Sequence, residues 1–262
     1  MTFNLKDYAK NKYSQFGEDG IIQKVFEILP SKEEYWCVEF GAWDGKYLSN
    51  TYELIANNGW KGILIEGNSK KIPDLKNSYS NNRNVTLINK LVSYEGVDIL
   101  DNILDTTSIP NNFDLLSIDI DGNDYHVWES LQNYKPNLVI VEFNPSIPSD
   151  VEFIQEKNLN VNHGNSLLSL VNLGKKKGYE LIATTTVNGF FIRKELFHLF
   201  NIKNNNISVL WDSETPAPRV FQLYDGTLAL TSKFELIWQR KSVDIFDLQI
   251  LSKDQRSFSD KP

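Results

Sequence analysis

Short apolar runs alternate with amphipathic segments along most of this sequence, and this alternation restricts the fold more than any other feature. The amphipathic segments carry apolar residues at helical spacing: GIIQKVFEIL, SNTYELIANNG, KKIPDLKNSYSNN, GVDILDNIL and DYHVWESLQNY. The apolar runs are strand-like: YWCVEFGA, KGILIEGN, NVTLINKLVS, FDLLSIDI and NLVIVEF. Strands that alternate with helices predict right-handed crossovers and a mostly parallel sheet covered by helices on both faces. We therefore expect a doubly wound α/β fold.

The chain continues past these runs with one more helical segment and a predicted hairpin. SLLSLVNLGKKKGY has lysines near its end and a glycine where a helix cap is needed. ELIATTT and GFFIRKEL, joined by a short VN turn, predict two late antiparallel strands. Residues 201–262 carry mixed signals. We expect them to form a C-terminal appendage packed on a single domain that spans residues 1–262.

Composition excludes several classes of protein. With 262 residues, 41% of them hydrophobic, the chain is long enough for a well-developed core. A net charge of -7 gives no reason to approach nucleic acid or anionic lipid, so no nucleic-acid partner is expected. The single cysteine, Cys37, lies in an apolar run, which predicts a buried thiol and fits a reducing cytoplasm. No signal peptide or membrane span is expected. The oligomeric state is left open, a homo-oligomer included.

The ends of the first two strand-like runs carry candidate ligand-binding residues. In an open α/β sheet, ligands bind outside the carboxyl ends of the strands. The first run ends in VEFGAWDGKYLSN, where Glu39 and Asp44 are acceptors and Gly41 lets a ligand approach the backbone. The second run ends at Glu66, placed to accept hydrogen bonds from a ribose diol. Each feature alone has an equally good interpretation without a ligand: Glu66 is then a surface acid, and the glycine-containing segment is a simple turn. Together they favour an adenosine-containing ligand.

Acidic residues also follow the fourth and fifth runs. Asp119 and Asp121 end one run, and Glu142 and Asn144 end the next. Because strand side chains alternate, each pair shares a face, and adjacent parallel strands bring the two pairs together. Carboxylate and amide oxygens suit Mg²⁺, Ca²⁺ or Mn²⁺. The sequence therefore predicts a divalent-metal site formed by these four residues.

A turn without a metal explains each acid equally well. In SIDIDGNDYHVW, a D-x-D-G run is also a polar turn whose acids cap the next helix. Asn123 or Asp124 is expected to cap free N–H groups at the start of that helix. An EF-hand is excluded: counted from Asp119, glycine comes at the fourth position rather than the sixth, and the twelfth residue is Ser130.

The chain has three histidines, of which one is a candidate base. His126 lies on a predicted helix and His198 in LFHLF, and no H-E-x-x-H zinc signature exists. His163, in the loop HGNS after the fifth strand, is expected near the reaction zone. A solvent-facing loop histidine without a role is an equally good interpretation. Asp119 is the second candidate catalytic residue.

Eight motifs in register resemble the FkbM-type family of class I S-adenosylmethionine-dependent O-methyltransferases, which have a Rossmann-like fold. They are SQFGEDGII, VEFGAWDGKYLSNT, GWKGILIEGN, LLSIDIDGND, VIVEFNP, HGNSLLSL, KKKGYELI and FQLYDGTL, and the resemblance extends from Ser14 to about Phe258. It implies S-adenosylmethionine as methyl donor, held by a site lined by Glu39, Gly41, Asp44 and Glu66. It also implies that the Gln15 to Asp19 stretch, with Gln15, Glu18 and Asp19, folds over that site.

More narrowly, the sequence resembles bacterial enzymes that methylate sugar hydroxyls of capsule or other surface glycans, on a heptose or a nucleotide-activated sugar. The expected function is therefore transfer of a methyl group from S-adenosylmethionine to such an acceptor. Mg²⁺ or Mn²⁺ is expected to assist by lowering the pKa of the hydroxyl, and His163 to accept its proton. Two alternatives stay open: a nicotinamide-dependent sugar oxidoreductase, which lacks support because no G-x-G-x-x-G is present, and a non-catalytic glycan- or cation-binding protein.

Overall fold

The chain divides into two compact units, residues 1–212 and 213–262. The structure is a computed structural model that describes residues 4–211 and 218–257. Part of the predicted appendage, residues 212–217 and 258–262 with Phe258 at the end of the family resemblance, lies outside the described residues.

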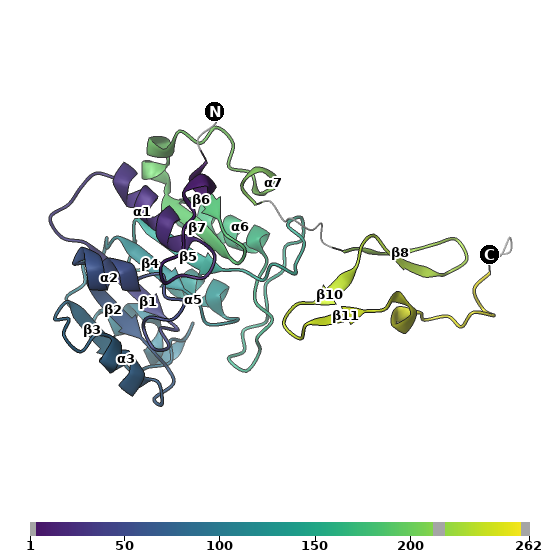
Figure 1. Cartoon of the computed structure of the whole chain (residues 1–262), viewed down its shortest axis with the longest axis horizontal. Helices are drawn as coiled ribbons and strands as arrows, with labels where there is room; N and C mark the ends of the chain where they lie inside the picture. Colours follow the sequence, from purple (N-terminus) through teal and green to yellow (C-terminus); the bar gives the residue numbers. More distant parts are fainter. Residues whose placement is uncertain (1–3, 212–217, 258–262) are drawn as a thin grey trace. The chain divides into compact units, whose positions relative to one another are not determined.

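A seven-stranded sheet with the order β3-β2-β1-β4-β5-β7-β6 forms the first unit (Figure 1). The strands are β1 (Trp36–Phe40), β2 (Lys61–Ile65), β3 (Val85–Ile88), β4 (Leu115–Ile118), β5 (Leu138–Glu142), β6 (Tyr179–Thr184) and β7 (Asn188–Arg193). The first five strands are parallel, and β7 runs antiparallel to both β5 and β6. The predicted doubly wound, mostly parallel sheet with a late hairpin is therefore confirmed. The strand order reverses between β1 and β4, where α/β sheets bind ligands.

Helices cover both faces of this sheet. They are α1 (Glu18–Ile28), α2 (Tyr52–Asn58), α3 (Ile72–Ser78), α4 (Leu100–Leu104), α5 (Asp124–Ser130), α6 (Leu167–Lys177) and α7 (Ile207–Leu210), with the short 3-10 helices η1 (Leu5–Tyr8), η2 (Gly96–Asp98) and η3 (Lys194–Phe200). Apolar residues of α1, α2 and α3 join one hydrophobic cluster, and those of α4, α5 and α6 join another. Within β1, Val38 and Phe40 belong to the α4–α6 cluster and Cys37 to the α1–α3 cluster, as the two-residue period requires.

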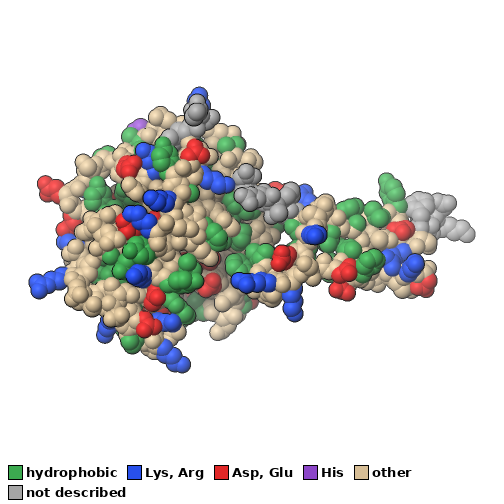
Figure 2. All heavy atoms as spheres, viewed as in Figure 1, with side chains coloured by type: hydrophobic (Ala, Val, Ile, Leu, Met, Phe, Trp, Pro, Cys, Tyr) green, Lys and Arg blue, Asp and Glu red, His purple; other side chains and the backbone are tan. Residues whose placement is uncertain are grey.

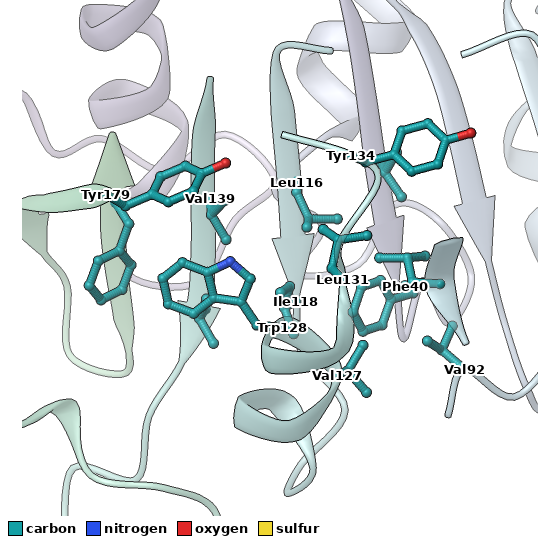
Figure 3. Close-up of a cluster of buried hydrophobic side chains, with 14 of the residues drawn as sticks. Phe40, Val92, Leu116, Ile118, Val127, Trp128, Leu131, Tyr134, Val139 and Tyr179 are labelled. Atoms are coloured by element: carbon teal, nitrogen blue, oxygen red, sulfur yellow. The ribbon is translucent and has the colours of Figure 1, made fainter. Parts of the chain in front are cut away.

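Trp128 of α5 is central to the α4–α6 cluster (Figure 3). It is 1% exposed, and its ring lies 5.8 Å from that of Tyr179 and 5.0 Å from that of Phe191. Val127 and Leu131 flank it on the same helical segment and face β1 and β4 (Figure 3). Because these side chains leave water together, α5 is fixed on the sheet directly after the D-x-D-G turn.

Capping residues fix where α6 begins and ends. The Ser166 side chain accepts a hydrogen bond from the Ser169 N–H, and Gly178 ends the helix in the left-handed region at φ 80°. Three lysines, residues 175–177, occupy the last turn and complement the helix dipole. The helix start therefore has a defined position directly after the loop that contains His163.

Residues 201–211, grouped by sequence with the C-terminal appendage, belong to the first unit. The Thr184 hydroxyl donates to the Leu210 carbonyl over 2.7 Å, and the Trp211 ring packs edge-on against Phe143. The second unit contains two hairpins, β8 (Val220–Gln222) with β9 (Leu228–Leu230) and β10 (Phe234–Leu236) with β11 (Lys241–Val243), followed by η4 (Ile245–Leu248).

None of the second unit's described residues is buried, and Figure 2 shows its hydrophobic side chains interspersed with charged ones at the surface. Within residues 4–211 and 218–257, no helix has the length and apolar character needed to cross a bilayer.

Candidate functional site

The loop after β1 contacts the turn after β4 through backbone atoms. Gly41 adopts φ 73°, and a Cβ at this position would lie 1.9 Å from the carbonyl oxygen of Asp119. Only glycine fits both the left-handed conformation and the close approach. The predicted donor loop and the predicted metal turn are therefore in direct contact.

Glu39, at the end of β1, holds the segment that leads into α2. Its two carboxylate oxygens accept hydrogen bonds from the Asn50 N–H (2.9 Å), the Ser49 hydroxyl (2.6 Å) and the Thr51 hydroxyl (2.7 Å). Burial raises the pKa of Glu39, although these three donors favour the ionised form. Glu39 is 6% exposed, so its carboxylate organises the loop after β1 from the protein interior.

Glu66, at the end of β2, joins the first two loops. Its carboxylate accepts hydrogen bonds from the Trp43 N–H (2.7 Å) and the Asn68 N–H (2.6 Å). The Trp43 ring is 46% exposed, and the Lys71 ammonium lies 4.0 Å from its centre. The Glu66 carboxylate is thus held in one orientation, and the residue is 6% exposed.

Asp44 shapes the tip of the same loop. Its carboxylate accepts hydrogen bonds from the N–H groups of Lys46 and Tyr47, and its carbonyl accepts one from the Ser78 hydroxyl. Asp44, which is predicted to bind the methyl donor, therefore also closes a tight turn.

Backbone strain is concentrated in these loops. Among the described residues, five non-glycine residues have positive φ, and three of them lie in the loops after β1 and β4: Trp43, Leu48 and Asp121. Such conformations cost about 1–3 kcal/mol each and gather where a loop is fixed for function.

The N-terminal stretch is organised by two buried carboxylates. Glu18 accepts hydrogen bonds from the Phe16 N–H, the Thr185 hydroxyl and the Asn188 amide, which ties the stretch to the β6–β7 turn. Asp19 is 8% exposed, and one of its oxygens accepts from the N–H groups of residues 12–14 and from the Ser14 hydroxyl.

This stretch also lies beside α2. The Tyr13 and Tyr52 rings are 4.5 Å apart, and the Lys12 ammonium lies 2.5 Å from Glu53. Gln15 is exposed, and its backbone carbonyl accepts a hydrogen bond from the Asn11 side-chain amide. The donor-binding roles predicted for Gln15, Glu18 and Asp19 stay predictions.

Three of the predicted metal ligands come together at the ends of β4 and β5. Carboxylate oxygens of Asp119, Asp121 and Glu142 all lie within 4.8 Å of one another. Protein atoms crowd the Asp119 carboxyl group although it remains accessible to solvent, and this desolvation, followed by repulsion from neighbouring acids, raises its pKa to about 7. The same causes raise the pKa of Glu142 to about 10, and its carboxyl group is hydrogen-bonded to that of Asp119. Metal binding by these residues stays a prediction.

Asp124 closes the turn that carries Asp119 and Asp121. Its two oxygens accept hydrogen bonds from the Ile120 N–H (2.9 Å) and the Gly122 N–H (2.8 Å), and burial raises its pKa to about 6. The capping role predicted for Asn123 is wrong: its side chain makes no capping bond and donates instead to the Asn158 carbonyl. Asp124, the first residue of α5, bonds to N–H groups of the preceding turn.

Asn144 lies beyond the end of β5 and connects two parts of the following loop. Its Oδ1 accepts a hydrogen bond from the Ser146 N–H, and its Nδ2 donates to the His163 carbonyl over 2.8 Å. Both amide atoms thus have protein partners, and a role as metal ligand stays a prediction. The His163 side chain is exposed, and the base role predicted for it also stays a prediction.

Four buried residues of this region carry no signal in the sequence for the contacts they make: Gln155 and Asn165, amides of this loop, and Thr185 and Asn188, which anchor Glu18. No periodicity or motif marks Gln155 in VEFIQEKNLN. Asn165, Thr185 and Asn188 act through contacts with segments far apart in the chain, whereas the Gln155 side chain bonds within its own irregular loop.

Residues 97–181 match the sequence profile described as Methyltransferase FkbM domain, which is less than half of the chain. The matched segment contains the D-x-D-G turn, Glu142 and His163, but neither Glu39 nor Glu66. No curated protein matches the sequence.

Solved structures with a similar fold include three methyltransferase-related proteins. The citrinin polyketide synthase CMeT domain is 11% identical with a TM-score of 0.44 over 67% of this chain, which spans 51% of that domain. The N-terminal domain of EvdMO1 with SAH bound is 11% identical with a TM-score of 0.42, covering 70% of this chain and 80% of that one. A SAM dependent methyltransferase from Aquifex aeolicus is 12% identical with a TM-score of 0.40, covering 67% and 88%. These likenesses are weak, and the fold is established by the strand order itself.

Proposed function

We propose that this protein is an S-adenosylmethionine-dependent O-methyltransferase that acts on a sugar hydroxyl. The observation that carries the proposal is the contact between Gly41 and the Asp119 carbonyl. This contact brings the loop after β1, where we propose that the donor nucleoside binds, against a cluster of carboxyl groups. A donor bound at the first and an acceptor held at the second would be neighbours, as methyl transfer between two bound molecules requires. The similarity of residues 97–181 to the FkbM methyltransferase domain supports the same reaction.

Glu66 is proposed to bind the ribose of the donor. A carboxylate has about four lone-pair sites, so two backbone donors leave capacity for two ribose hydroxyls. The hydrogen bonds from Trp43 and Asn68 fix its orientation before the ligand arrives, which lowers the entropic cost of binding. Glu39 would contribute indirectly, by holding residues 49–51 in place.

Asp119, Asp121 and Glu142 are proposed to hold Mg²⁺ or Mn²⁺. Oxygen donors are the ligands these ions prefer, and none of the three acids forms an ion pair with Lys, Arg or His of the described chain. Desolvation by surrounding protein atoms, followed by repulsion among the neighbouring acids, raises the pKa values of Asp119 and Glu142, and a bound cation would favour their ionised forms. A divalent cation bound there would supply a compensating positive charge and would lower the pKa of an adjacent hydroxyl.

The hydroxyl proton needs an acceptor, and two groups are proposed. His163 lies on the loop after β5. Its backbone carbonyl accepts a hydrogen bond from Asn144, which is two residues beyond Glu142. Asp119, with its pKa raised to about 7, exchanges a proton near neutral pH while no cation is bound. With a cation bound, Asp119 would be a ligand and His163 the base.

Calorimetry with S-adenosylhomocysteine and with NAD⁺ tests the proposal. Binding of S-adenosylhomocysteine alone supports it. Binding of NAD⁺ alone would indicate an oxidoreductase, and binding of neither a non-catalytic protein. The acceptor class, a nucleotide-activated sugar or heptose for a bacterial surface glycan, rests on the motif resemblance. A screen of nucleotide-activated sugars for methyl transfer checks it, and turnover only on non-sugar hydroxyls would contradict it.

A further inference from the structure

The loop between β5 and α6, residues 143–166, contains no helix or strand, yet it includes amide side chains removed from solvent. Gln155 is 2% exposed and Asn165 is 0% exposed. A loop without regular structure must pair its backbone groups in another way, and buried side-chain amides are suited to this because each both donates and accepts.

The Gln155 side chain bonds only to the last part of its own loop. Its Oε1 accepts hydrogen bonds from the His163 N–H (2.9 Å) and the Gly164 N–H (3.0 Å), and its Nε2 donates to the Val161 carbonyl (2.9 Å). Two consecutive N–H groups thus converge on one oxygen, and Gly164 itself is in the left-handed region at φ 69°. This amide fixes the backbone of His163.

The backbone of Gln155 is in turn anchored to neighbouring elements. Its N–H donates to Asn165 Oδ1 (3.1 Å), and its carbonyl is 2.8 Å from Nε2 of the buried His126 on α5. Asn165 Nδ2 donates to the Gly122 carbonyl (2.8 Å). A Cβ on Gly122 would lie 3.0 Å from Gln155 Oε1, so this amide lies directly against the D-x-D-G turn.

His163 is held from the opposite side as well. Its carbonyl accepts the hydrogen bond from Asn144, and the Asn144 N–H donates to the Asn165 carbonyl over 2.9 Å. The His163 peptide is therefore held between the end of β5, which carries Glu142, and the turn that carries Asp119 and Asp121.

We infer that Gln155 is a positioning residue that fixes His163 relative to the carboxyl cluster at the ends of β4 and β5. The inference rests on the proposed function, because it assigns His163 a place in methyl transfer. The side-chain hydrogen bonds of Gln155 all go to residues 161–164, which include His163. Loss of the Gln155 side chain is therefore expected to free the loop and leave the sheet intact.

Two variants and a control test this inference in the full-length protein. Gln155→Met keeps the length of the side chain and removes all three hydrogen bonds, whereas Gln155→Glu keeps the acceptor oxygens. The control is Asn137→Ala, which removes a buried amide at the amino-terminal ends of β4 and β5, away from the carboxyl cluster. There, Asn137 Nδ2 donates to Asp114 (3.1 Å). The readouts are amide hydrogen exchange at His163 and Gly164, S-adenosylhomocysteine affinity by calorimetry, and kcat with an acceptor that the parent protein methylates.

In Gln155→Met we expect about tenfold faster exchange at both amides and at least about tenfold lower kcat, with S-adenosylhomocysteine affinity within about twofold of the parent. Gln155→Glu should stay closer to the parent in exchange and in kcat, and should decide the matter if Gln155→Met does not fold. Asn137→Ala should lower the melting temperature and change none of the three readouts. Unchanged exchange in Gln155→Met, or faster exchange with parental kcat and KM, would overturn the inference. A parent protein that binds no S-adenosylhomocysteine would overturn the proposed function instead, before any substitution is made.

Discussion

A Cβ on Gly41 would lie 1.9 Å from the carbonyl oxygen of Asp119, which leaves no space for any side chain between the loops that follow β1 and β4. The carboxyl cluster and the predicted donor loop are therefore coupled through backbone atoms. Any displacement at Gly41 must move Asp119, Trp43 or both.

Gly41→Ala is expected to destabilise the fold and weaken donor binding, and Gly59→Ala provides a matched control. The two glycines have nearly the same φ, 73° and 74°, but a Cβ on Gly59 meets nothing within 4 Å. Gly59→Ala should cost about 1 kcal/mol from backbone strain alone. Gly41→Ala should cost clearly more and also reduce S-adenosylhomocysteine affinity. Urea unfolding and calorimetry measure both, and equal costs at the two sites would contradict the close contact.

Glu66→Ala is expected to weaken S-adenosylhomocysteine binding by about tenfold or more, because ribose hydroxyls lose a charged acceptor. Stability should also fall by about 1–3 kcal/mol, since the Trp43 and Asn68 N–H groups lose their partner. Glu66→Gln keeps one acceptor oxygen, so its S-adenosylhomocysteine affinity and its stability should lie between those of the parent and those of Glu66→Ala. If the folded Glu66→Ala protein bound S-adenosylhomocysteine as tightly as the parent, the donor site would have to be assigned elsewhere.

The sequence predicted that Asp119, Asp121 and Glu142 meet at the strand ends, but not the contacts that hold the surrounding loops. Parallel strands bring their carboxyl ends to one edge, so residues directly after the apolar runs, such as Asp119 and Glu142, could be expected to meet. The partners of Glu39 and the anchoring of His163 by Gln155 could not be predicted, because they depend on the path of irregular loops. Those paths are set by side-chain hydrogen bonds within and between irregular segments, which leave no periodic pattern in the sequence.

Asp121→Asn is expected to weaken Mn²⁺ binding at least about tenfold, because one of three clustered carboxylates loses its charge. Glu156→Gln, which neutralises an exposed acid in the loop before α6, is the control and should bind Mn²⁺ as the parent does. Calorimetry with Mn²⁺ on chelator-treated protein measures the effect. Chelation should also abolish turnover, and Mg²⁺ or Mn²⁺ should restore it. Full activity in metal-free protein would leave the cluster with turn-forming roles only.

His163→Ala is expected to lower kcat by about 10² to 10⁴ with donor affinity unchanged, as for the loss of a general base. His198→Ala is the control, because His198 lies on η3 and bonds only locally, to the Glu195 carbonyl. Steady-state kinetics and calorimetry measure the two quantities. A variant with raised KM and nearly parental kcat would make His163 an acceptor-binding residue.

In cation-free protein, stability is expected to fall as pH rises through about 7. The folded-state pKa of Asp119 is raised to about 7, above the value of about 4 in an unfolded chain, so the protonated group favours the folded state. That contribution is fully present below pH about 4 and is lost as pH rises through about 7. Glu142, with its pKa raised to about 10, extends the fall to higher pH.

Melting temperatures between pH 4 and 9 in EDTA, compared with Asp119→Asn, isolate the part of this fall that belongs to the cluster. The variant has no charge to develop at this position, and it also relieves repulsion on Glu142, so its decline should be shallower. Added Mg²⁺ should flatten the parent curve and hardly change that of Asp119→Asn, because the cation compensates the charge that the variant lacks. Parallel curves for parent and variant in EDTA would mean that Asp119 stays ionised throughout, already compensated by its surroundings, and would remove the electrostatic support for a cation at this site.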